Sequence, residues 1–258
     1  MTLSTTGQRP VPSWLITHSY TDRDAGVLKS GKEAEVFLVE RSSEEGSCLL
    51  AHKRYRPRYP GKGELREVGF SKGTIYRGDA IYRAGWNLNR RDGLAVRTGS
   101  RFGHQLAASI WPANEMAMLE LAWRAGASVP YPVARTDEGL LMEFIGDHAA
   151  AAPRLVNARL EPAKAAGARR QLIDSLHAMA SAGVVHGDLS PYNMLWWHGR
   201  LVVIDFPQAV EATTNPHALE LLHRDLVNVA DWFARQRAPI DVDRLYGSLL
   251  GLVFGGSR

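Results

Sequence analysis

The sequence predicts an α+β fold with two lobes, the first small and rich in strands and the second mainly helical. Three short strand-like segments lie before residue 55, whereas apolar residues at helical spacing dominate after residue 110. Gly146 follows the short apolar run Leu140–Ile145 and offers a break between the two parts. The expected parts are an N-terminal arm at 1–26, a first lobe at 27–145 and a second lobe at 146–258.

Three strands are expected in the first lobe, one after another. The first, Val27–Ser30, turns at Gly31 into a second at Val36–Glu40, and the third is Cys48–Arg54. The polar run SSEEGS supplies the turn between the second and the third. Alternation and short polar turns of this kind are typical of an antiparallel sheet.

A long segment, residues 55–109, follows the third strand and shows no steady period. It is rich in glycine, arginine and aromatic residues. From Arg54 to His104 the sequence has 12 Lys or Arg and 4 Asp or Glu, a local balance of +8 in a chain whose net charge is +4. Such a basic loop could contact RNA phosphates, a ribosome or an acidic partner, or it could simply be a solvated loop.

Helices are expected at three places beyond this loop. Pro112 suits a first helical turn, and Gly126 can end that helix. A second helix is predicted over residues 161–182, where apolar residues recur on one face. A third begins at Asn215, because an Asn followed by Pro forms a good pair of N-cap and first helical residue.

Composition excludes several other classes of protein. No run approaches the roughly 20 consecutive apolar residues that span a bilayer, and the first residues lack the basic and apolar regions of a secretory signal. Cys48 is the only cysteine, which excludes an internal disulfide and a cysteine-based zinc site. These features favour a cytoplasmic protein with no membrane partner.

The strongest chemical signal is the segment VVHGDLSPYNMLWWHGRLVVIDF, which begins at Val184. Asp188 is followed five residues later by Asn193, and Asp205 comes twelve residues beyond. Phosphoryl transfer needs a group that orients the attacking hydroxyl and oxygen ligands for a divalent metal, and kinases supply them as an Asp and an Asn in one loop and an Asp in the next. The sequence therefore predicts Asp188 as a catalytic residue and Asn193 and Asp205 as ligands of Mg²⁺ or Mn²⁺.

Two weaker signals lie in the first lobe. The segment Leu28–Val36 (LKSGKEAEV) keeps only Gly31 of the three glycines in a kinase phosphate loop and has Lys29 at the first glycine position, so a plain hairpin turn is the alternative. Lys53 lies on the third strand, where kinases place a lysine that contacts the phosphates and pairs with a helix glutamate. Lys53 is accordingly the second predicted catalytic residue, and Glu115 is its expected partner.

Together these residues resemble the RIO family of atypical serine/threonine protein kinases. The family's S-T-G-K-E-A loop resembles the run Ser30–Ala34 with the lysine before it. Its catalytic segment is similar to Val185–Asn193, and its metal segment looks like Ile204–Gln208. The resemblance covers roughly residues 27–235, and the short arm before it looks most like the bacterial type of the family.

The resemblance implies a protein-kinase-like fold that binds ATP between its lobes and transfers the γ-phosphate to Ser or Thr, or uses ATP hydrolysis as a switch. It implies an adenine site at a hinge where backbone groups of Glu143 and Ile145 face the base. It also makes Asp225 the structural aspartate that braces the catalytic loop. The cofactor-binding residues expected in this way are Ser30, Gly31, Lys32, Val36, Lys53, Glu115, Met142, Glu143 and Ile145.

Two other function classes compete with this interpretation. Aminoglycoside and choline kinases share H-G-D-L-x-x-x-N, so a small-molecule phosphotransferase is an alternative, although only 53 residues follow Asp205 to form a substrate region. An RNA-associated binding module that uses the basic loop is a third, non-enzymatic hypothesis. The phosphate acceptor of a kinase would be an unidentified protein or the chain itself.

Overall fold

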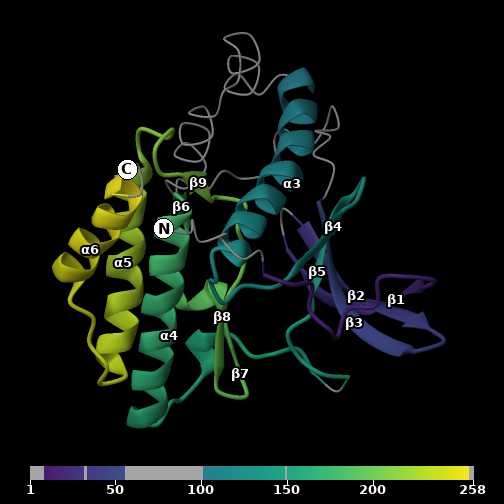
Figure 1. The fold of residues 1–258 in the computed structure, drawn as a ribbon, viewed down its shortest axis with the longest axis horizontal. Coiled ribbons are helices and arrows are strands. Elements are labelled where there is room, and N and C mark those ends of the chain that lie inside the picture. Colours follow the sequence, from purple (N-terminus) through teal and green to yellow (C-terminus); the bar gives the residue numbers. More distant parts are fainter. Residues whose placement is uncertain (1–8, 32–33, 56–100, 149, 256–258) are drawn as a thin grey trace, which may run out of the picture.

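A computed structural model describes residues 9–31, 34–55, 101–148 and 150–255 of the chain (Figure 1). Five antiparallel strands form the sheet of the first lobe in the order β1-β2-β3-β5-β4. The strands are β1 (Thr21–Ser30), β2 (Ala34–Ser43), β3 (Gly46–Tyr55), β4 (Pro132–Arg135) and β5 (Gly139–Glu143).

The three predicted strands are confirmed, but each is longer than its apolar residues indicate. Strand β1 begins at Thr21, so the last residues of the expected arm belong to the sheet. There Thr21 pairs with Ser42, and these polar residues continue the ladder because backbone hydrogen bonding does not require apolar side chains. Strand β4 was not predicted, since Pro132 argues against a central strand, but it lies at the sheet edge where proline is tolerated.

Helix α3 (Arg101–Arg124) corrects two expectations. The predicted loop ends earlier than residue 109, because residues from Arg101 onward are helical, while residues 56–100 lie outside the described part of the chain. Pro112 lies inside this helix rather than at its start. A proline removes one backbone donor from the helix, and the surrounding helical turns can tolerate that loss.

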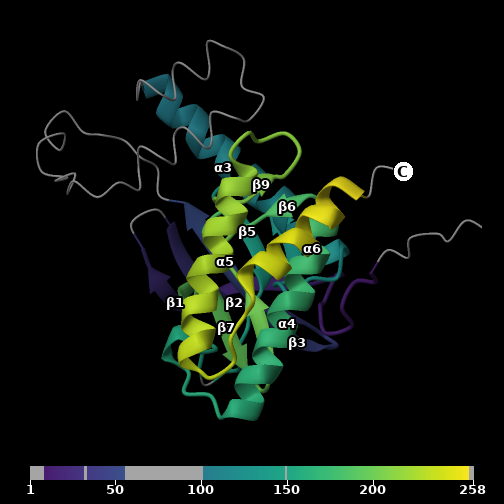
Figure 2. The same cartoon turned by 90° about the vertical axis from the view of Figure 1, so that its left-hand side faces the viewer.

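The second lobe is mainly helical, with short strand pairs that carry its loops. Helices α4, α5 and α6 lie side by side on the side of β7 and β8 away from the five-stranded sheet (Figures 1 and 2). Its elements are η2 (Leu155–Asn157), α4 (Pro162–Ser181), β6 (Val184–Val185), η3 (Pro191–Asn193), β7 (Met194–Trp197), β8 (Arg200–Val203), β9 (Val210–Glu211), α5 (Ala218–Arg235) and α6 (Val242–Gly255).

The predicted helices of this lobe are confirmed with small shifts, and one was missed. Helix α5 begins at Ala218 instead of Asn215, because the Asn215 side chain accepts the His217 backbone N–H and forms a turn before the helix. Helix α6 was not predicted, although it buries Leu245 and Leu249 one turn apart. Within the described residues, none of the helices has the length and apolar character to cross a membrane.

One large hydrophobic core joins α3, the helices of the second lobe and the inner face of the sheet at Leu140. A smaller cluster covers the opposite face of the sheet and includes Leu50 and Leu141. Leu15 and Ile16 pack against this smaller cluster, so the described part of the N-terminal arm covers the outer face. The inner face therefore remains turned toward the second lobe, and the predicted site lies between them.

Candidate active site

Strand register places the first-lobe residues of the site on one face of the sheet. Val36 pairs with Lys53 across β2 and β3, and Lys53 pairs with Leu140 across β3 and β5. Directly paired residues of antiparallel strands point to the same face. Ala51 and Met142 form the next pair on that face, so an apolar surface lies beside the lysine.

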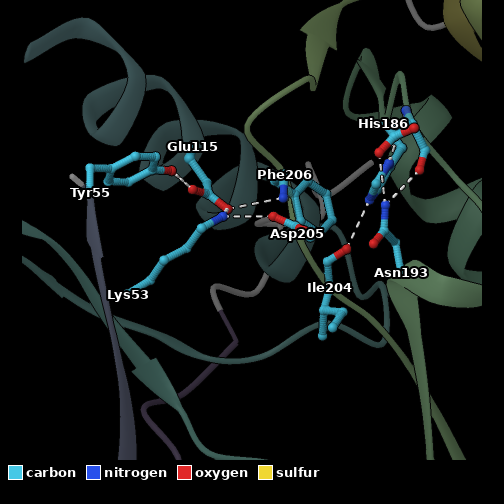
Figure 3. Close-up of polar contacts among 9 residues, drawn as sticks. Lys53, Tyr55, Glu115, His186, Asn193, Ile204, Asp205 and Phe206 are labelled. Atoms are coloured by element: carbon cyan, nitrogen blue, oxygen red, sulfur yellow. Dashed lines mark hydrogen bonds and ion pairs between the residues drawn. The ribbon is translucent and has the colours of Figure 1, made fainter. Parts of the chain in front are cut away.

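The ammonium of Lys53 joins the two lobes (Figure 3). Its Nζ donates to Glu115 Oε1 of α3 and to Asp205 Oδ1 of the second lobe, each at 2.7 Å. Lys53 is 8% exposed and Glu115 2%, whereas the Asp205 side chain is 35% exposed. The predicted pairing of Lys53 with Glu115 is thus present, and Asp205 closes the group from the other side.

The charges in this cluster stabilise one another. Burial disfavours the charged ammonium, but Asp205 and Glu115 outweigh burial and hold the pKa of Lys53 above its usual value. The Lys53 charge in turn lowers the pKa of Asp205 to about 2. Asp205 therefore remains ionised at neutral pH, as a metal ligand must be.

Glu115 is held by two further donors. The Phe206 backbone N–H donates to its Oε1 at 3.0 Å, and the Tyr55 hydroxyl donates to its Oε2 (Figure 3). The Lys53 ammonium also lies 5.4 Å from the centre of the Tyr55 ring. Tyr55 was not predicted as a site residue, because a tyrosine at a strand end carries no motif of its own.

The catalytic loop turns at Gly187 for a steric reason. Gly187 has a φ of +77°, and a Cβ placed there would lie 2.5 Å from the Gln208 carbonyl oxygen. The arginine that common kinases have at this position would clash with the backbone of the metal-binding segment. The close approach of the two loops therefore explains why this chain has H-G-D where common kinases have H-R-D.

Asp225 of α5 braces this loop, as the resemblance implied. Its carboxylate accepts the backbone N–H groups of Gly187 at 2.8 Å and Leu189 at 3.0 Å. Arg224 donates to the Gly187 carbonyl from the same helix. Burial raises the pKa of Asp225 to about 7, and the two backbone donors oppose that rise.

Asp188 and Asn193 lie in contact within the loop. The Asn193 amide nitrogen donates to the Asp188 carbonyl at 2.9 Å and to its carboxylate at 3.0 Å. This contact fixes the carboxylate and leaves the Asn193 amide oxygen as the group that can bind a cation. The Ile204 N–H donates to the Asn193 carbonyl at 2.9 Å, so both predicted metal ligands lie on connected segments.

His186 is buried and connects the loop of Asp188 with the segment of Ile204. Its Nε2 donates to the Ile204 carbonyl at 3.1 Å, its Nδ1 accepts the Asp188 N–H at 3.3 Å, and its ring lies 4.8 Å from that of Phe206. One nitrogen donates and the other accepts, which is the pattern of a neutral imidazole. Burial agrees with this assignment, since it lowers the pKa of His186 to about 4.

The donor set fits a divalent metal ion, Mg²⁺ or Mn²⁺, that is shared with phosphates. Among the described residues no three His, Cys, Asp or Glu side chains gather into a closed metal site. Asp205 and Asn193 offer one carboxylate and one amide oxygen, and Mg²⁺ takes its other ligands from water and phosphate oxygens in such sites. Asp205 has a left-handed φ of +73°, a backbone conformation that is uncommon outside functional turns.

The other predicted cofactor residues of the first lobe differ in where they lie relative to the site. The Gly31 N–H donates to the Ala34 carbonyl and closes the tight turn, while Lys32 lies outside the described residues. The Ser30 hydroxyl donates to Glu35, and that pair lies on the face of the sheet opposite Lys53. The side chain of Ser30 is therefore not among the groups that converge on the site.

The hinge residues Met142 and Glu143 end β5, and Ile145 follows it toward the second lobe. Met142 lies on the inner face, whereas the Glu143 carboxylate accepts the Tyr131 N–H and pairs with Arg200 at the outer face. The Glu143 N–H donates to the Tyr131 carbonyl, and the Ile145 carbonyl accepts the Ala152 N–H. The Ile145 N–H donates to no group among the described residues, so it can donate to a base.

Comparisons with known proteins agree with these motifs. A family model described as RIO domain matches residues 87–245. The RIO-type serine/threonine-protein kinase Rio1 of Haloferax volcanii is 35% identical over 238 residues, which cover 92% of this chain and 72% of that protein. The human serine/threonine-protein kinase RIO1 is 37% identical over 88% of this chain and 36% of its own length.

A third relative, the Rio1 kinase of Thermoplasma acidophilum, is 33% identical over 53% of this chain and 70% of its own length. The chain thus spans most of the two archaeal relatives but about a third of the human one. The bacterial type stays a prediction, since these relatives are archaeal and eukaryotic. On the family match and the similarity along nearly its whole length, the chain belongs to the RIO domain family.

Proposed function

We propose that this chain is an ATP-dependent serine/threonine-protein kinase of RIO type. The observation that carries the proposal is the meeting of Lys53 from the sheet with Asp205 from the second lobe at 2.7 Å, next to the bonded pair Asp188 and Asn193. A lysine, a metal-binding aspartate and a fixed catalytic aspartate are the groups that phosphoryl transfer requires. The relatives described above carry the name of protein kinases, which supports a protein acceptor over a small molecule.

Each residue then has one task. Asp188 accepts the proton of the attacking hydroxyl, and the Asn193 amide holds its carboxylate in position. Lys53 positions the phosphates, while Glu115 keeps the ammonium in place. Bound ATP with Mg²⁺ or Mn²⁺ would supply the phosphoryl group and neutralise its charge, with Asp205 and Asn193 as the protein ligands of the metal.

Adenine would bind at the hinge between the lobes. Val36, Ala51 and Met142 present an apolar surface on the inner face of the sheet. The Ile145 N–H, which has no acceptor among the described residues, would donate to the base. We place the boundary between the lobes at residue 146, where Gly146 has a φ of +153° and ends the hinge. Contact of the basic segment with RNA remains a prediction from its charge.

The proposal is tested by measuring transfer of labelled γ-phosphate from ATP to the chain itself and to general protein acceptors, with Mg²⁺ or Mn²⁺. Asp188→Ala should lower turnover by a factor of about 10³ or more and leave ATP affinity nearly unchanged. Asp174→Ala, the same change at an exposed position of α4, is the matched control and should retain activity. Equal turnover in the Asp188 variant and the unaltered chain would refute the proposal.

A further inference from the structure

Lys29, which stands at the first glycine position of a kinase phosphate loop, lies on the face of the sheet that carries Lys53. It pairs with Val36 across β1 and β2, and Val36 pairs with Lys53 across β2 and β3. The three side chains therefore form one row on the inner face, with Lys29 two strands, or roughly 10 Å, from Lys53. The contact of Ser30 with Glu35 confirms that the neighbouring residue points to the outer face.

Arg154 approaches the same space from the second lobe. It is the extended residue before η2, and it forms an isolated β-bridge with Leu195 of β7, two residues beyond Asn193. Arg154 and Lys29 are near enough to act on one another, since partial burial and then the charge of Arg154 lower the pKa of Lys29. The charge of Asp205 raises the pKa of Lys29, whereas the charge of Lys53 lowers it, as that of Arg154 does.

These two cations have no carboxylate of their own. Among the described residues, no hydrogen bond and no ion pair within 4.0 Å involves the Lys29 ammonium or the Arg154 guanidinium. The carboxylate of Asp205 is already bonded to Lys53. Lys29 is exposed and Arg154 is half-buried, and two like charges near one another repel, so an anion bound between them would remove that repulsion.

We propose that Lys29 and Arg154 bind the terminal phosphates of ATP from the two lobes. Lys29 replaces, with one ammonium, the backbone donors that a glycine-rich loop would offer at this position. Because Lys29 and Lys53 lie in one row, each ammonium can contact one end of the phosphate chain of ATP. The phosphate chain would then pass Asp205. This inference rests on the proposed kinase function and adds a determinant of selectivity for triphosphates over shorter nucleotides.

The test is calorimetric titration of the full chain with ATP, ADP and adenosine in the presence of Mg²⁺. Lys29→Met and Arg154→Gln should each weaken ATP binding by about tenfold or more, ADP binding less, and adenosine binding hardly at all. Lys29→Arg should retain most of the ATP affinity because the charge is kept. Lys164→Met, at an exposed position of α4, is the matched control and should bind like the unaltered chain.

Four results would overturn the inference. Unchanged ATP affinity in Lys29→Met would exclude a phosphate contact, and an equal loss for ATP and adenosine would assign Lys29 to the fold rather than to phosphate. Thermal melting of each variant tests independently whether the substitution has destabilised the fold. If the unaltered chain bound adenosine and ADP as tightly as ATP, the selectivity would be absent. If it bound no ATP at all, the kinase proposal and this inference would fail together.

Discussion

The two sides of the site are built in different ways. On the second lobe, residues 186–206 and Asp225 of α5 form a set of short contacts, in which His186, Asn193 and Asp225 are all buried. On the first lobe, β1 is exposed along nearly its whole length, and its site residue Lys29 has no partner among the described residues. The second-lobe side of the site is thus held by its own contacts, whereas the β1 edge of the first lobe is not.

Lys53 is the link between these halves. Its contacts with Glu115 and Asp205 are ion pairs that connect the sheet with α3 and with the segment after β8 that carries Asp205. A buried ion pair of this kind adds little net stability by comparison with apolar packing, but removing one partner leaves an uncompensated charge. The comparison therefore predicts large effects at the link and small effects on the exposed hairpin.

The largest effect is expected for Lys53→Met. Glu115 would lose its cationic partner in a site where it is 2% exposed, and the free energy of unfolding should fall by about 3 kcal/mol. Chemical denaturation monitored by circular dichroism would measure this loss. The double variant Lys53→Met with Glu115→Gln should recover part of it, because no buried charge would then be left unpaired.

The matched control for this change is Arg23→Met in the exposed hairpin. Arg23 pairs with Glu40 at 2.6 Å across β1 and β2, but its side chain is 78% exposed. Solvent screens such a pair, so the loss should stay below about 1 kcal/mol. Similar losses in the two variants would contradict the distinction between a buried link and a solvated hairpin.

The sequence was most informative where contacts are local. Asp188, Asn193 and Asp205 are separated by short segments whose strands and turns fix their spacing, so the motif alone predicted that they would converge. Lys53 and Glu115 are 62 residues apart, and their pairing could be expected only from the kinase template. Tyr55 and Arg154 were missed, because their roles depend on neighbours that are distant in sequence.

Strand register explains the difference between Ser30 and Lys29. The two residues are adjacent, so one must point outward when the other points inward. A motif comparison aligns letters but does not give the pairing with β2, which includes an irregularity between Val27 and Lys29. The start of α3 was missed for a similar reason, since Pro112 marks a helix end more often than a helix interior.

An effect of intermediate size is expected from the protonation of His186. Its pKa is lowered to about 4 in the folded chain against an ordinary value of 6.5, so below pH 6.5 the unfolded chain binds more protons. Between pH 7 and pH 5 this difference should cost roughly 2 kcal/mol of stability. The loss increases until the pH falls through about 4, where the folded chain is protonated as well.

The protonation of Asp225 changes stability in the opposite direction to that of His186. The pKa of Asp225 is raised to about 7, and its contribution to stability is lost as pH rises toward that value. The measurement must therefore compare His186→Phe with the unaltered chain at each pH, so that the Asp225 contribution cancels. The variant should lose less stability on acidification. Parallel curves for the two proteins would show that His186 does not titrate as its burial implies.

The smallest effect is expected for Tyr55→Phe, which removes only the hydroxyl that donates to Glu115. Glu115 keeps Lys53 and the Phe206 N–H, so the free energy of unfolding should fall by about 1 kcal/mol while ATP affinity changes little. Tyr20→Phe, at an exposed position stacked on Arg41, is the control and should change stability less. If Tyr55→Phe instead reduced ATP affinity as strongly as Lys53→Met, the position of the lysine would depend on this hydroxyl, and the link between the lobes would have to include Tyr55.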